Sequence, residues 1–223
     1  MAKNRVTRKQ LLNEPDEFIT TANRAMNWAR ENTRTLVVGG CVILVVAALL
    51  SIFSYNRQAR AEAAETRLGQ VLAKYQTAVD AKDPVAALEE VRGDLDELSA
   101  SYGNTSAGRL SAVIYGNICI AGLDYDDAVT QYEKSLNHFG PASSLGNVIL
   151  NGLATAYQQK GDYNQAVSYY KQVADGSGTV LKDAALFNLG RLYGQLGQAK
   201  DSRQAYDRLA AEFPQSMYAK LVK

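Results

Sequence analysis

The sequence is poor in the side chains that build catalytic sites and disulfide frameworks. It has one histidine, His138, and two cysteines, Cys41 and Cys119. A Ser-His-Asp or Cys-His arrangement would need His138, which falls near the end of a predicted helix and is better explained as an exposed or capping side chain. The cysteines lie in a long apolar run and in a packing helix, so they cannot form a disulfide framework. Since the sequence also has no Walker or dinucleotide-binding loop, we expect no enzyme and no cofactor.

Neither sign of charge dominates the sequence. It has 24 Lys and Arg and 23 Asp and Glu, divided into 7 and 4 before residue 35 and 17 and 19 after residue 56. The part after residue 56 therefore has a formal charge of minus two. Because it lacks the basic face of a nucleic-acid-binding domain, we expect no nucleic acid among the partners.

Three aspartates, Asp124, Asp126 and Asp127, superficially resemble a calcium-binding loop. They lack the glycine and the distal glutamate of an EF-hand loop, so we predict no metal site. Asp124 and Asp162 each stand just before a predicted helix. A carboxylate at such a position accepts hydrogen bonds from the free backbone N–H groups of the helix, so we predict that both residues are N-caps.

The sequence has one long uncharged apolar run, Thr35 to Asn56, between Arg34 and Arg57. Its 22 residues form about 33 Å of helix, enough for a hydrocarbon core of roughly 30 Å. A buried core helix is the alternative, but a helix that is apolar on every face suits lipid better. Thirty-four residues precede the run, and it is longer than the apolar region of a typical signal peptide. We therefore predict a single transmembrane helix over residues 35–56.

The basic residues around this segment predict its orientation. Seven basic residues precede the segment, and Arg57, Arg60 and Arg67 are the three that follow within about 15 residues. The positive-inside rule places residues 1–34 in the cytoplasm as a short arm. If the membrane is the inner membrane of a Gram-negative bacterium, everything after residue 56 lies in the periplasm.

The cytoplasmic arm contains a second helical pattern. Pro15 opens it, and Trp28 lies close to the membrane boundary. One face carries its apolar residues: Phe18, Ile19, Ala22, Ala25, Met26 and Ala29. This pattern is typical of a short amphipathic helix in the headgroup layer, and a solvated, frayed arm is the alternative.

Residues 57–104 are predicted to form a helical pair. The segment from Arg57 to Lys82 is rich in strong helix formers, so we expect the membrane helix to continue beyond the bilayer. Asp83 and Pro84 then end one helix and start the next, which reaches Gly103. The two helices would pack antiparallel.

The remainder of the sequence repeats itself. Segments that start at Tyr115, Leu153 and Leu189 align without a gap. In each segment a small residue follows at once, a second small residue stands thirteen places after the start, and a tyrosine comes four residues later. The second small residues are 38 and 36 residues apart. Such regular self-similarity is typical of a repeat architecture.

These positions resemble those of tetratricopeptide repeats, which have a period of about 34 residues. The third segment has almost the whole family signature: Leu189, Gly190, Tyr193, Ser202, Tyr206 and Pro214. The resemblance implies an all-α fold, with a single N-terminal transmembrane helix, the helical pair, and a tetratricopeptide-like α-solenoid of about three repeats over residues 105–223. Small residues let paired helices approach closely, and aromatic rings fill the space beside them. We therefore predict four mostly core tyrosines: Tyr157, Tyr170, Tyr193 and Tyr206.

The resemblance also implies where a partner binds. Solenoids of this kind present a concave surface, lined by the first helix of each pair. The side chains that point away from the packing positions there form a predicted peptide-binding groove: Asn117, Asn151, Thr155, Gln158, Gln159, Asn188, Arg191 and Gln195. Amides can hydrogen-bond an extended backbone without demanding a sequence, and Arg191 could pair with a carboxylate. Each of these residues could equally be an ordinary solvated side chain.

The order of segments along the chain resembles the ancillary Sec-translocon subunit family, which consists of membrane-anchored periplasmic tetratricopeptide proteins. The likeness rests on the arm that ends in NWARENTRTL, one apolar span, the helix ARAEAAETRLGQVLAKYQ and the repeats. It implies a non-enzymatic adaptor with the Sec channel, periplasmic chaperones or secreted clients as partners. A subunit for cytochrome c maturation or envelope assembly, or a structural subunit of another membrane complex, remains open, as does the oligomeric state.

Overall fold

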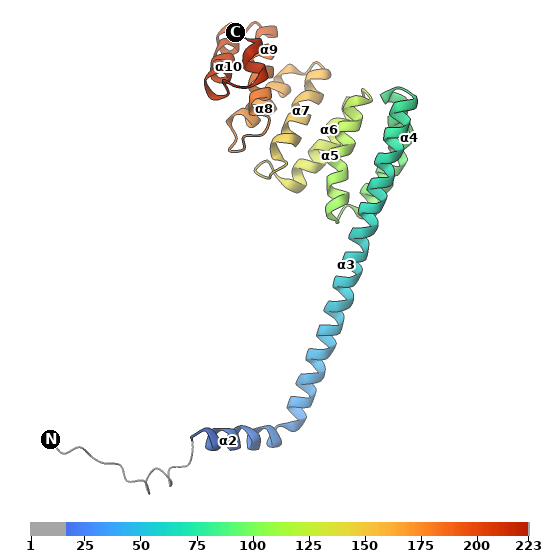
Figure 1. Ribbon diagram of the computed structural model, residues 1–223, viewed down its shortest axis with the longest axis vertical. Helices are drawn as coiled ribbons and strands as arrows, with labels where there is room; N and C mark the ends of the chain where they lie inside the picture. The colour runs from blue at the N-terminus through green and yellow to red at the C-terminus, as the bar shows by residue number, and fades with distance from the viewer. Residues whose placement is uncertain (1–16, 223) are drawn as a thin grey trace, which may run out of the picture. The chain divides into compact units, whose positions relative to one another are not determined.

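The computed structural model describes residues 17–222, with side chains from residue 21 onward, and contains helices and turns but no strand in that range (Figure 1). The predicted helix start at Pro15 lies outside the described residues. The chain divides into two compact units, Met1–Arg57 and Gln58–Lys223. The first unit contains helix α2, Glu17–Glu31, and the beginning of α3. The all-α fold predicted from the sequence is confirmed.

Helix α3, Thr33–Ala81, is a single helix of 49 residues. It contains the predicted apolar run and, as expected, continues well beyond it. The apolar part is long enough and apolar enough to cross a membrane, and none of it is buried by other parts of the described chain. A core helix of a soluble protein would be mostly buried, so its full exposure favours the membrane interpretation.

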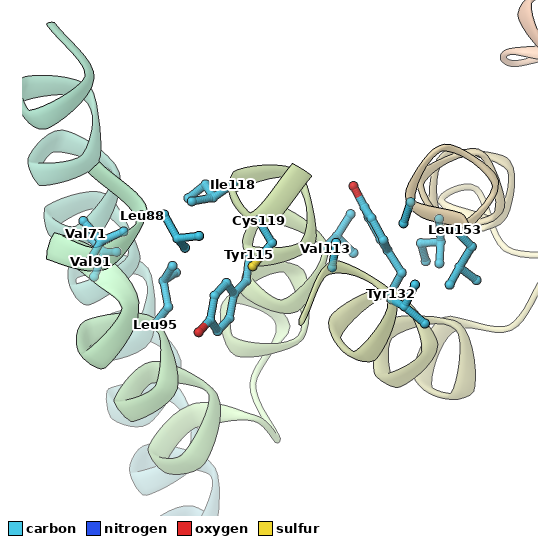
Figure 2. Packing of buried hydrophobic residues seen from close by; sticks show 14 residues of the cluster. Val71, Leu88, Val91, Leu95, Val113, Tyr115, Ile118, Cys119, Tyr132 and Leu153 are labelled. Carbon is cyan, nitrogen blue, oxygen red and sulfur yellow. The ribbon is translucent and has the colours of Figure 1, made fainter. Parts of the chain in front are cut away.

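The second unit opens with the predicted helical pair. The part of α3 from Gln58 onward packs against α4, Pro84–Tyr102, whose first backbone N–H groups bond to the Asp83 carboxylate at 2.9 and 3.0 Å. Figure 2 shows Val71 of α3 beside Leu88 and Val91 of α4, and all three side chains are buried. The Pro84 ring occupies the first helical position, where a missing N–H costs nothing.

Three further helix pairs follow in sequence, and each packs against the next. Their bounds are Ser106–Ala121 (α5) with Tyr125–Phe139 (α6), Gly146–Gln159 (α7) with Tyr163–Asp175 (α8), and Lys182–Gln195 (α9) with Ala199–Glu212 (α10). A short helix α11, Met217–Leu221, packs on α9 and α10. This is the predicted solenoid of three repeats (Figure 1). Pro141 lies in the turn between the first and second pairs, and Pro214 lies in the turn after the third pair.

The repeated small residues make room for the repeated tyrosines. The ring of Tyr132, on α6, lies so close to Gly116 of α5 that a Cβ atom there would be 2.8 Å from it. A Cβ atom at Gly152 of α7 would overlap the same ring from the other side. In the third repeat, Gly190 has the same relation to the Tyr206 ring. The tyrosine therefore sets the distance between its own first helix and that of the next repeat (Figure 2).

The turn inside each repeat uses one residue in the left-handed conformation. The equivalent positions are Leu123, Gly161 and Gly197, with φ of 61°, 81° and 74°. Glycine adopts this conformation without cost, whereas an L-residue with a side chain does not. Leu123 is also 62% exposed, so its side chain gains little from packing. At this turn the first repeat thus has a strained residue where the other two repeats have glycine.

We predict that Leu123→Gly stabilises the domain by about 0.5–1 kcal/mol, because relief of the left-handed strain exceeds the entropy that glycine loses on folding. Urea unfolding of the full chain in detergent micelles, followed by helical circular dichroism, measures this change. The reciprocal variant Gly161→Leu is the matched control and should destabilise the domain by a similar amount. A destabilising effect of Leu123→Gly would contradict the assignment of strain.

Two glycines on α9 allow a paired test of the tyrosine contact. We predict that Gly190→Ala destabilises the domain by about 1–3 kcal/mol, because the new methyl group overlaps the Tyr206 ring. At Gly194 a Cβ atom would meet only the Ser202 Oγ, at 3.7 Å, so Gly194→Ala should be neutral or stabilise by up to about 1 kcal/mol. The same urea titration measures both, and equal effects of the two changes would refute the role of the close contact.

Candidate functional site

The eight residues of the predicted groove all lie on the first helices of the three pairs. Asn117 is on α5, residues 151–159 are on α7, and residues 188–195 are on α9. Four of the side chains are exposed, and four are half-buried. The exposed ones are Asn117, Gln159, Arg191 and Gln195, and the half-buried ones are Asn151, Thr155, Gln158 and Asn188.

One groove residue binds a buried tyrosine. The Tyr132 side chain is 1% exposed, but its hydroxyl donates a hydrogen bond of 2.6 Å to the Asn117 Oδ1 on α5. Burial raises the pKa of the Tyr132 hydroxyl, so the group stays protonated and acts as the donor. The Asn117 side chain therefore satisfies a core hydroxyl, and its amide nitrogen is left for other partners.

Two further groove residues contact the hydroxyl of a second tyrosine. The hydroxyl of Tyr170, on α8, lies 3.2 Å from the Thr155 Oγ1 and donates to the Gln158 Oε1 at 3.3 Å. Burial raises the pKa of Tyr170, while the hydrogen bond with Thr155 and the positive charge of Arg191 act in the opposite direction. Thr155 and Gln158 thus contact one hydroxyl, and the charge of Arg191, from the next repeat, acts on the same group.

The remaining groove residues have fewer partners. The Asn151 Oδ1 is buried yet accepts no hydrogen bond within the described chain. The side chains of Gln159, Asn188 and Gln195 make no hydrogen bond to another described residue. The Arg191 guanidinium lies 5.9 Å from the centre of the Phe187 ring on the same helix and forms no ion pair with a described residue. Apart from the buried Asn151 Oδ1, these side chains keep donors and acceptors that an extended polypeptide could use.

The sequence-based interpretation missed the polar role of the tyrosines. Of the four predicted core residues, Tyr170 is buried, whereas Tyr157, Tyr193 and Tyr206 are half-buried. The hydroxyls of Tyr132 and Tyr170 reach polar side chains at equivalent repeat positions. The sequence did contain a signal for these contacts, because a polar residue comes directly after the first small residue of each repeat. Tyr157 instead stacks on Tyr169, with ring centres 5.6 Å apart.

Ion pairs join successive helix pairs away from the groove. Arg92 of α4 binds Asp124, at 2.8 Å, and Asp127 at the start of α6. Partial burial alone would raise the pKa of Asp124, but hydrogen bonds from Arg92 and from the Asp127 backbone N–H lower it below its usual value. Asp126 binds Lys160 of the next repeat. The aspartates that resembled a calcium loop are therefore engaged by cationic side chains.

The remaining predictions concern the two N-caps, Cys119 and His138. Asp124 and Asp162 each accept a hydrogen bond of 3.1 Å from the backbone three residues later, so both predicted N-caps are confirmed. Cys119 is fully buried, and burial, followed by the charges of Asp124 and Asp127, raises the pKa of its thiol to about 12. It is a packing residue. His138 is exposed in the last turn of α6.

The stacked helix pairs, their glycine–tyrosine contacts and the polar first helices define an α-solenoid of the kind that binds proteins. The chain belongs to the tetratricopeptide repeat-like domain family, whose sequence profile matches residues 26–223. No curated protein matches the chain.

Similar solved structures support the same fold. A putative kinesin light chain from Podosopora anserina with nearly identical TPR-like repeats is 16% identical, with a TM-score of 0.54 over 71% of this chain and 81% of that one. A tetratricopeptide repeat protein from Parabacteroides merdae ATCC 43184 is 20% identical, with a TM-score of 0.55 over 70% of this chain and 57% of that one. At these identities the likeness shows the fold alone.

Proposed function

We propose that this protein is a non-enzymatic adaptor, anchored in the bacterial inner membrane, that binds extended segments of other proteins in the groove of its repeat domain. The tetratricopeptide-like repeats support a role in protein–protein interaction. The groove residues supply the chemistry, because amides and hydroxyls can pair with the backbone of any unfolded chain. The single observation that carries the proposal is the strip of polar side chains with free donors and acceptors along α7 and α9.

The side chains of the groove indicate what kind of polypeptide it would bind. Its polar residues are neutral amides and hydroxyls, apart from Arg191. An extended backbone presents alternating N–H and C=O groups that such residues match without regard to sequence. Arg191 adds a place for a carboxylate, either of a side chain or of a C-terminus. A groove of this kind suits many clients of modest affinity better than one fixed partner.

The membrane anchor is part of the same proposal. The apolar part of α3 serves as the transmembrane segment, with the preceding residues 1–34 in the cytoplasm and the repeat domain in the periplasm. The exposure of the apolar helix surface supports the transmembrane segment. The excess of basic residues before it supports this orientation. In this proposal, which the resemblance to ancillary Sec-translocon subunits supports, the groove lies beside the exit of the secretion channel, receives emerging chains and passes them to periplasmic chaperones.

A direct test of the groove uses the full-length protein in lipid nanodiscs and an unfolded polypeptide as probe, fluorescently labelled reduced and carboxymethylated α-lactalbumin. We expect the variant with Asn151, Asn188 and Arg191 replaced by alanine to bind the probe about tenfold more weakly, which is about 1.4 kcal/mol. Fluorescence anisotropy measures both affinities. Loss of donors that face the groove is the physical reason.

A matched control changes the same residue types on the second helices. Asn137→Ala, Asn164→Ala and Arg203→Ala replace exposed side chains of α6, α8 and α10. This control should bind the probe as the unchanged protein does, and circular dichroism should show that both triple variants remain folded. If the groove variant and the control bind equally well, the groove is not the client-binding surface.

The secretion role has a separate test. We expect that the full-length protein, purified at native abundance in mild detergent, recovers Sec channel subunits by mass spectrometry, and that a form without residues 1–56 does not. The anchor would provide the channel contact, since the Sec channel is itself a membrane protein. Reproducible enrichment of another inner-membrane complex, for example one for cytochrome c maturation or envelope assembly, would instead support a structural or assembly subunit.

A further inference from the structure

We propose that α2 is a lipid-binding helix that lies on the membrane surface, with one face immersed at the boundary of headgroups and acyl chains and its arginines bound to anionic lipid phosphates. This inference rests on the membrane anchoring in the proposed function, but concerns a second contact with the bilayer. It assigns a ligand, anionic phospholipid, to a part of the chain outside the repeat domain.

The first argument is the distribution of side chains around α2. Ala22, Ala25, Met26 and Ala29 follow the i, i+3, i+4, i+7 spacing that places them on one face of a helix. The side chain of Met26 is 52% exposed, and no other described helix covers this face. Apolar residues at this spacing normally pack against another element, so the uncovered face needs an occupant.

The second argument is the distance to the apolar run, which identifies that occupant. Only Asn32 separates the end of α2 from the start of α3. Asn32 keeps both of its backbone hydrogen bonds, since its N–H donates to the Trp28 oxygen and its oxygen accepts from the Leu36 N–H, both at 3.0 Å. The seven residues from Trp28 to the apolar run, helical except for Asn32, span only about 10 Å. When the run is in lipid, Trp28 is therefore held near the surface. Because α2 bends sharply away from the axis of α3 (Figure 1), the rest of α2 can lie along the same surface, where one lipid layer covers both apolar faces.

The third argument is the charge that accompanies the apolar face. Arg24 and Arg30 are exposed on α2, and Arg34 follows in the first turn of α3. Long arginine side chains can extend from a helix that lies in the interface and reach the phosphate groups of lipids. Asn23 and Asn27 lie with Arg24 on the polar side of the helix, away from the apolar face. A polar face with arginines beside an apolar face is typical of interfacial helices.

The only tryptophan of the chain makes the inference directly measurable. Trp28 lies on α2 and is 59% exposed, so the intrinsic tryptophan fluorescence of the whole protein reports on this helix alone. The experiment places the full-length protein in vesicles of phosphatidylethanolamine and phosphatidylglycerol whose acyl chains carry bromine, a contact quencher. We expect the brominated chains to reduce Trp28 emission about twofold or more relative to unbrominated vesicles.

Two glutamate variants separate immersion from mere proximity to the membrane. Ala25→Glu places a charge on the apolar face, whereas Asn27→Glu places the same charge on the water-facing side. We expect Ala25→Glu to lose most of the quenching and Asn27→Glu to keep it. Equal quenching in the two variants, or no quenching in the unchanged protein, would overturn the proposal. In vesicles of phosphatidylcholine alone the quenching should fall, and an unchanged value would overturn the contact with anionic lipid.

Flotation in a density gradient after alkaline carbonate treatment distinguishes this inference from the proposed anchoring. A protein that floats with the vesicles and whose Trp28 is quenched supports both. A protein that floats but whose Trp28 is unquenched and open to aqueous iodide is anchored by α3 only, which overturns the surface helix alone. A protein that does not float lacks the anchor, which overturns both.

Discussion

Close contact between a tyrosine ring and the glycines of two first helices controls the geometry of the repeat domain. Tyr132 occupies the space that Cβ atoms at Gly116 and Gly152 would need, so α5 and α7 can approach it only because these residues have no side chain. Each repeat of a solenoid buries its apolar face only against its neighbours, so an error in one spacing passes to every later repeat. The position of the groove residues on α7 and α9 therefore depends on these contacts.

The same tyrosines connect the core to the groove. Their rings are almost fully buried, but the hydroxyls of Tyr132 and Tyr170 end at polar side chains of the first helices. A buried hydroxyl without a partner is costly, so these bonds favour one arrangement of the two helices within a repeat. On other surfaces, ion pairs such as Arg92 with Asp124 join one pair to the next. Packing thus sets the spacing, and polar contacts add to its specificity.

The sequence was sufficient to predict the helices, because their signals are local. Asp124 and Asp162 precede their helices directly, and the spacing of small residues and tyrosines repeats in all three segments. The hydroxyl partners could not be predicted, since whether Thr155 reaches Tyr170 depends on a distance between helices that no local pattern contains. The strain at Leu123 was visible only by comparison with Gly161 and Gly197, once the φ angles were known. The groove itself remains a prediction.

The hydrogen bonds of the tyrosines divide the groove into two kinds of position. Asn117, Thr155 and Gln158 hold core hydroxyls, so replacing them changes the stability of the domain together with its surface. Gln159 and Gln195 make no such bond and are free to vary without that cost. Under the proposed function, client preference would therefore be redesigned chiefly at Gln159 and Gln195, the last residues of α7 and α9.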